Sequence, residues 1–342
     1  MRASLIPSLL ITINILLNGC TSLPEKSQYK LPANLKTSYT TSQIQQPKLR
    51  SGQIVVSESG DDYSLFFSIF SEQYSPFVHA GVLVFVDGVP FVYEELGSVP
   101  LIMGNVPTDS ITGGIRRRHL DQYLKAENYT AIYDLPADIE HNKVVEYVLY
   151  NYKHETPFDP YMNTQEHDKL YCTEFVLQAL KAGGMKKTTL SQYRENKSLK
   201  TIHKWLKITD SNVIQADSLI ETENHVITLS PHHSYRELQL YIASREELHR
   251  RFTKNQKLGN LFEWTGFKLK FRPVVSQFHK AAMQLLQNDP IPNWQTARKA
   301  VEQLAIDFFG PYKPESPERQ MSLIENPALP CTNKPSSAKI TC

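Results

Sequence analysis

The sequence predicts an α+β fold, in which strands and helices alternate around one antiparallel sheet. An Asp-Gly pair at 87–88 separates two apolar runs, and this is among the strongest short-range signals of a β-hairpin. Two segments, 138–152 and 172–182, carry apolar residues at helical spacing and alternate with short apolar strands. Together these patterns indicate a sheet covered by helices.

The composition narrows the class of protein. The chain has 342 residues, of which 41% are hydrophobic and 21% charged, as in an ordinary globular protein. This excludes a disordered chain and a membrane protein with many spans. The formal net charge is only +2, so nothing points to a nucleic-acid partner. Four cysteines are too few for a scaffold built on disulfides.

The first residues predict an export signal over 1–19. Arg2 precedes an apolar stretch that ends in Gly19-Cys20, which resembles a bacterial lipobox with Cys20 as the lipidated residue. The alternative is an ordinary export signal that happens to contain a cysteine. Thr21 follows the cysteine in place of an acidic retention signal. We therefore expect a lipid anchor in the bacterial cell envelope, at the outer membrane and facing the periplasm.

The polar segment 20–48 is typical of a flexible tether, and 313–342 of a Pro/Ser-rich tail. An oxidising compartment allows a disulfide between Cys331 and Cys342 in that tail. Cys172 is then left without a partner.

The body is expected over 49–235. Its elements follow in order: a strand at 52–57, a helix at 61–73, the hairpin at 77–96, a strand leading into a short helix at 115–126, a strand at 129–134, a helix at 138–152, an irregular stretch at 153–170, and a helix at 172–182 that Gly183-Gly184 ends. Val144, Val145, Val148 and Leu149 are expected on the apolar side of the 138–152 helix.

A helical extension is expected over 236–312. Ser234 and Glu237 form a capping box, and apolar residues from Ala297 to Phe308 keep helical spacing until Gly310-Pro311 ends the pattern.

Cys172 is a candidate nucleophile because it begins a helix. The positive end of a helix favours the thiolate over the thiol, and its free N–H groups could hold an oxyanion. The alternative is a buried cysteine that acts as a small hydrophobic residue.

His79 and Glu94 favour the catalytic interpretation. A two-residue loop at 87–88 places Gly81 opposite Glu94, so His79 and Glu94 become diagonal neighbours, roughly 5–8 Å apart. A carboxylate beside an imidazole fixes its tautomer and raises its basicity. The alternative is a solvated histidine near an unrelated acid.

These motifs resemble the YiiX/YaeF-like proteins, which are circularly permuted relatives of the NlpC-type papain-like cysteine hydrolases. The resemblance rests on the order of four segments: Gly52-Gln53-Ile54-Val55-Val56, Phe77-Val78-His79-Ala80-Gly81-Val82, Phe91-Val92-Tyr93-Glu94, and Tyr171-Cys172-Thr173-Glu174-Phe175-Val176.

The resemblance implies a permuted papain-like fold. Cys172 would be the nucleophile, His79 the base and then acid, Glu94 the orienting residue and Tyr171 a pocket residue. Gln53 replaces the family's usual aspartate and Thr173 its serine, and neither carries the chemistry. The region 236–342 has no counterpart.

Other candidates are weaker. His154, His167 and His232-His233 lack metal-ligand spacing, so we expect solvated loop histidines, no metal and no cofactor. Arg116-Arg117-Arg118 is typical of a solvated strand end, or could contact an anionic substrate.

Three functions remain open. The first is a lipid-anchored cysteine hydrolase that cleaves amide or peptide bonds, with cell-wall peptides as the leading substrate. The second uses the same triad on lipid or acyl-ester bonds, as a hydrolase or acyltransferase. The third is an envelope binding module without catalysis.

Overall fold

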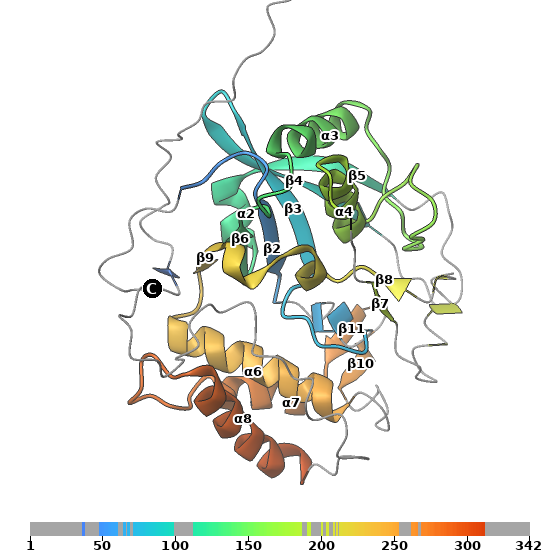
Figure 1. Cartoon of the computed structure of the whole chain (residues 1–342). Helices are drawn as coiled ribbons and strands as arrows, with labels where there is room; N and C mark the ends of the chain where they lie inside the picture. The colour runs from blue at the N-terminus through green and yellow to red at the C-terminus, as the bar shows by residue number, and fades with distance from the viewer. Residues whose placement is uncertain are drawn as a thin grey trace, which may run out of the picture.

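The computed structural model describes residues 36–37, 48–60, 64–65, 67–68, 71–98, 112–186, 190–192, 200, 203–204, 208, 210, 212–252, 261–265 and 268–311 (Figure 1). The signal 1–19, the lipidation candidate Cys20, most of the tether and the pair Cys331 and Cys342 lie outside these residues. The predicted helix at 61–73 is described at 64–65 and 67–68, where the backbone is helical, and at 71–73, where it is not helical and the prediction is wrong.

The α+β class is confirmed, and its centre is an antiparallel sheet in the strand order β1-β9-β6-β2-β3-β4-β5. The hairpin strand β3 lies between β2 and β4, as expected of a strand that is apolar on both faces. The strands are β1 (Lys36–Thr37), β2 (Ile54–Glu58), β3 (His79–Val86), β4 (Val89–Ser98), β5 (Thr112–His119), β6 (Tyr129–Tyr133) and β9 (His225–Ser230).

Helices cover both faces of the sheet. α2 (Leu120–Ala126) packs on one face with Val55, Leu83 and Val92, and α3 (His141–Lys153) and α4 (Cys172–Ala182) share a larger core with the other face. Alternate residues of each strand point to opposite faces, so the apolar side chains of one strand contribute to both of these cores.

α3 departs from its prediction in two ways. It begins at His141 rather than near 138, and Leu149 is 38% exposed although it was expected on the apolar side. Val144, Val145 and Val148 do face the core, and they form a stripe too narrow to include Leu149.

The region after 235 is helical for the most part, with α6 (Tyr235–Arg251), α7 (Pro273–Ala282) and α8 (Trp294–Phe309) packed beside one another below the sheet in Figure 1. The capping box of Ser234 and Glu237 is present. This region also contains a hairpin that the sequence patterns did not predict, formed by β10 (Phe262–Thr265) and β11 (Lys268–Phe271).

Among the described residues, four short elements lie between α4 and β9 in the chain. They are β7 (Ser191–Gln192), β8 (Asn212–Val213), and the 3-10 helices η2 (Ala216–Leu219) and η3 (Thr222–Asn224). β7 and β8 pair with each other, and η2 packs against α4. This places the segment 213–216 beside the first turn of the candidate nucleophile helix.

Candidate active site

The β3–β4 hairpin sets the first two candidate residues side by side. Asp87 and Gly88 at its tip have φ of 51° and 79°, the pair of left-handed residues that a tight two-residue turn requires. The predicted register is confirmed, because Gly81 pairs with Glu94. His79 Nε2 lies 2.7 Å from Glu94 Oε2, and the Glu94 side chain is fully buried.

The hairpin ladder opens next to this pair. β3 and β4 stop pairing at Gly81 and Glu94, whereas β4 continues against β5 as far as Ser98 and Thr112. The Ala80 N–H therefore has no ladder partner on β4 and donates to the sulfur of Cys172. The opening lets a side chain from α4 reach the end of β3.

Cys172 and His79 face each other at this opening. Since Glu94 occupies Nε2 of His79, the remaining ring nitrogen, Nδ1, is the one available to Cys172, with which His79 shares a hydrogen bond. Burial disfavours both charged forms, but the attraction between the thiolate and the imidazolium outweighs it. The pKa of Cys172 is therefore lowered, and the pKa of His79 is raised well above its ordinary value.

The first turn of α4 holds Cys172 in place. Tyr171 is the N-cap residue, and its N–H donates to the carboxyl of Glu174, three residues along the helix. The Thr173 N–H donates to the Cys172 sulfur, and Thr173 Oγ1 donates to the Ile214 carbonyl at 2.8 Å. The sulfur thus accepts from one backbone N–H of the helix N-terminus, that of Thr173, and from one of β3, that of Ala80.

Glu174 also contacts a histidine of the preceding loop. Its Oε1 lies 2.8 Å from Nδ1 of His167. His167 is in a loop and its side chain is 48% exposed, as expected, but it is also paired with this buried carboxyl. Burial and the neighbouring Asp159 raise the pKa of Glu174 to about 8.

Arg118 was expected at a solvated strand end, but its guanidinium is bonded to two carboxylates. Its Nε donates to Glu94 Oε1, and its Nη2 donates to Glu94 Oε2 at 2.8 Å and to Glu127 Oε1 at 2.9 Å. Burial favours a neutral Glu94, but the hydrogen bonds and charges of His79 and Arg118 lower its pKa. Glu94 is therefore ionised and held from two sides.

A further carboxyl, that of Glu95, lies on the opposite face of β4 from Glu94. Glu95 is 1% exposed, and neither of its oxygens has a hydrogen-bond partner in the part of the chain that the structure describes. Burial, and then the negative charge of Cys172, raise its pKa to about 9, so Glu95 is neutral at pH 7. No motif in the sequence singled out Glu95.

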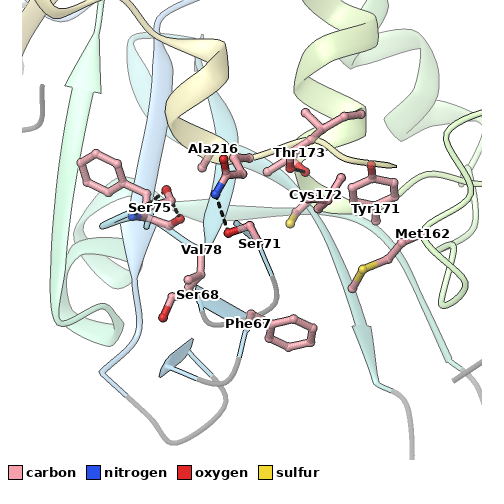
Figure 2. Close-up of a pocket in the computed structure, with 14 residues that line it drawn as sticks. Phe67, Ser68, Ser71, Ser75, Val78, Met162, Tyr171, Cys172, Thr173 and Ala216 are labelled. Carbon is pink, nitrogen blue, oxygen red and sulfur yellow. Dashed lines mark hydrogen bonds between the residues drawn. The ribbon is translucent and has the colours of Figure 1, made fainter. Parts of the chain in front are cut away.

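A cavity of about 80 Å³ lies against Cys172 and Tyr171. Figure 2 shows Cys172 between the wall that contains Tyr171 and Met162 and the wall that contains Phe67, Ser71 and Val78. Most of the lining is apolar. The complete lining is Phe67, Ser68, Ser71, Ser75, Phe77, Val78, Met162, Tyr171, Cys172, Thr173, Val213, Ile214, Gln215 and Ala216.

The polar groups of the cavity wall are turned into the protein. The hydroxyls of Ser68, Ser71 and Ser75 donate to the carbonyls of Leu65, Gln73 and Phe77. The Gln215 amide donates to Ser71 Oγ and to a backbone carbonyl. The cavity therefore offers an apolar surface beside the sulfur. Its residues come from distant segments, so no local sequence signal could have assembled it.

Two of the other candidate histidines contact side chains outside the site. His154 stacks on Tyr150, and His233 bonds Asn128 Oδ1 at 2.9 Å and stacks on Tyr241, so His233 is not the solvated residue expected. Among the described ranges, no three His, Cys, Asp or Glu side chains are grouped so as to hold a metal ion. No helix in those ranges has the length and apolar character needed to span a membrane.

Comparison with known proteins gives one distant structural likeness. No family model and no curated protein sequence matches the chain. The crystal structure of the metalloprotein YiiX from Escherichia coli O157:H7 is similar at a TM-score of 0.38 and 16% sequence identity, over 50% of this chain and 91% of that one. The roles of the site residues therefore rest on their own geometry.

Proposed function

We propose that this protein is a cysteine hydrolase that cleaves amide or peptide bonds with Cys172 as nucleophile, His79 as acid and base, and Glu94 as orienting residue. The observation that carries the proposal is the chain of contacts from Glu94 through the His79 ring to Cys172. The permuted papain-like assignment belongs to the same proposal and rests on the order of the sequence motifs.

The thiolate of Cys172 attacks the substrate carbonyl carbon and forms a tetrahedral intermediate, whose oxyanion the N–H groups at the start of α4 stabilise. The intermediate collapses as His79 Nδ1 gives its proton to the leaving nitrogen, which departs as an amine. A thioester remains on Cys172. His79 then takes a proton from water, and the hydroxide displaces the thiolate to release the acid and restore the ion pair.

The test is turnover by the full-length protein on cell-wall peptides, followed by mass spectrometry of the products. We expect new amine and carboxyl termini, and a loss of at least about 10³-fold in Cys172→Ala. Tyr171→Phe serves as a matched control, because it changes the pocket wall but leaves the three chemical groups in place. Turnover that survives in Cys172→Ala would contradict the proposal, and an unreactive thiol without turnover would favour the binding module.

A second substrate class is favoured by the apolar cavity. An acyl ester presents its carbonyl carbon directly beside a hydrocarbon chain, and the wall around Cys172 would receive that chain without leaving a polar group unpaired. Acyl esters of increasing chain length distinguish the two classes. Ala216→Leu narrows the cavity, so it should slow longer acyl donors more than acetyl donors if acyl groups occupy it.

The cell compartment is part of the proposal. An export signal over 1–19 and lipidation at Cys20 would hold the enzyme at the outer membrane, facing the periplasm and its cell-wall substrates. Metabolic labelling with a radioactive fatty acid tests this directly. We expect label in the wild-type protein and none in Cys20→Ser.

A further inference from the structure

Glu94 does not act on His79 alone, because its carboxylate is shared. Glu94 Oε2 lies 2.7 Å from His79 Nε2 and 2.8 Å from Arg118 Nη2, and Glu94 Oε1 accepts from Arg118 Nε. The planar guanidinium therefore grips both oxygens in a fork, which fixes the plane of the carboxylate as well as its position. The direction in which Glu94 meets the imidazole follows from that plane.

The charge of Arg118 is shared in the same way. Arg118 Nη2 also donates to Glu127 Oε1 at 2.9 Å, and Glu127 Oε2 accepts from Ser57 Oγ at 3.2 Å. The Tyr123 ring lies under the guanidinium at 4.4 Å and stacks 6.4 Å from the His79 ring. All of these groups lie on the face of the sheet that α2 covers.

The balance of charge is informative. Two carboxylates, Glu94 and Glu127, share one guanidinium, so this group of three carries a net charge of about −1 when all are ionised. The imidazolium of His79 neutralises it. A lone Arg118–Glu94 pair would instead be neutral by itself and would attract the imidazolium only weakly.

We propose that Arg118 and Glu127 are positioning residues which, together with Glu94, form a clamp that sets the orientation and the positive charge of His79. Arg118 supplies the orientation through its fork. Glu127 offsets the charge of Arg118, so that the charge of Glu94 remains available to His79. The inference deepens the proposed function and rests on it.

Substitutions of the two residues are expected to have different effects. In Glu127→Gln the full charge of Arg118 falls on Glu94, the imidazolium is less stable and the thiolate is less populated. In Arg118→Lys the charge stays but the fork is lost, so the thiolate persists while Glu94 no longer holds the ring in one plane. A purely structural role would affect both variants alike.

The experiment measures iodoacetamide labelling of Cys172 against pH, together with turnover, in the full-length protein. We expect Glu127→Gln to lower the labelling rate at pH 7 by roughly three- to tenfold and to move the labelling midpoint to higher pH. Arg118→Lys should keep the wild-type midpoint and lower kcat by at least about tenfold. Arg117→Gln is the matched control, because Arg117 stacks on Phe91 and Tyr152 and does not touch Glu94.

A midpoint for Glu127→Gln equal to that of the wild type would overturn the clamp and leave the proposed function intact. NMR titration of the His79 ring in Cys172→Ala tests the clamp without the thiol. There, Glu127→Gln should lower the pKa of His79, and an unchanged titration would overturn the inference. The proposed function would instead be contradicted by a labelling midpoint of Cys172 that is the same in the wild type and in His79→Ala. The NMR titration does not involve the thiol, so it distinguishes a failure of the clamp from a failure of the proposed function.

Discussion

The carboxyl of Glu95 shows at the scale of one residue how this site departs from a well-packed core. Its two oxygens are buried without a partner among the described residues, and its pKa lies near 9, against 4.5 for an unperturbed glutamate. As the pH rises, Glu95 therefore loses its proton at a lower pH in the unfolded chain than in the folded protein. The stability contributed by the neutral form is complete below pH 4.5 and is lost as the pH rises towards 9.

Glu95→Gln keeps the shape and removes this titration. Because the carboxyl must stay neutral in the fold, the free energy of unfolding of the wild type is about 3 kcal/mol lower at pH 7 than at acid pH. The stability of Glu95→Gln relative to the wild type should therefore increase progressively between pH 5 and 9. Urea unfolding at several pH values measures the difference. The exposed Glu140→Gln serves as the control, and stability curves for Glu95→Gln and wild type that stay parallel would refute the assigned ionisation.

The sequence could place some of these residues and not others. The Asp-Gly turn determines the hairpin register within a few residues, so the contact of His79 with Glu94 is local and predictable. Arg118 comes from β5, whose register against β4 is not fixed by a tight turn, and Glu127 lies beyond α2. Their contacts with Glu94 depend on tertiary packing, which residue spacing does not encode.

The β3–β4 hairpin is the element on which the site depends. Gly81 lies where a Cβ would come within 2.8 Å of both the Tyr93 carbonyl oxygen and Val92 Cγ1, and 3.4 Å from Glu94 Cβ. A side chain there would push β3 away from β4 at the last pair before the ladder opens. The glycine thus allows the close approach that brings His79 to Glu94.

Gly81→Ala is therefore expected to destabilise the fold by about 1–3 kcal/mol, as overpacking does, and to weaken the effect of His79 on Cys172. Thermal unfolding and iodoacetamide labelling measure the two effects. Gly88→Asn is the control within the same hairpin, because Gly88 has open space around it and asparagine tolerates its left-handed φ. Equal stability of Gly81→Ala and wild type would contradict the claim that β3 and β4 lie too close together at Gly81 to admit a side chain.

At the scale of the whole molecule, a buried ion pair joins the sheet to the helices after residue 235. Arg245 on α6 donates to Glu58 at the end of β2, and both side chains are 3% exposed. Tyr241 and Asn128 complete the hydrogen bonds of that carboxylate. Glu58 follows Ser57, which contacts Glu127, so the helices are fixed to a strand that also supports the site.

Glu58→Gln leaves the guanidinium of Arg245 buried without a counter-charge, so it should cost about 3–5 kcal/mol. Replacing both partners, as in Glu58→Gln with Arg245→Met, should recover most of the loss. Urea unfolding by circular dichroism and tryptophan fluorescence gives the double-mutant cycle. We expect one cooperative transition in the wild type, and two separate transitions would contradict this linkage of sheet and helices.

The central claim is that Cys172 and His79 form an ion pair, and the most direct measurement is the pH dependence of iodoacetamide labelling at Cys172 in wild type and His79→Ala. We expect a wild-type midpoint below the ordinary thiol value of about 8.5, and a return towards that value in His79→Ala. A midpoint near the ordinary value in both proteins would contradict it.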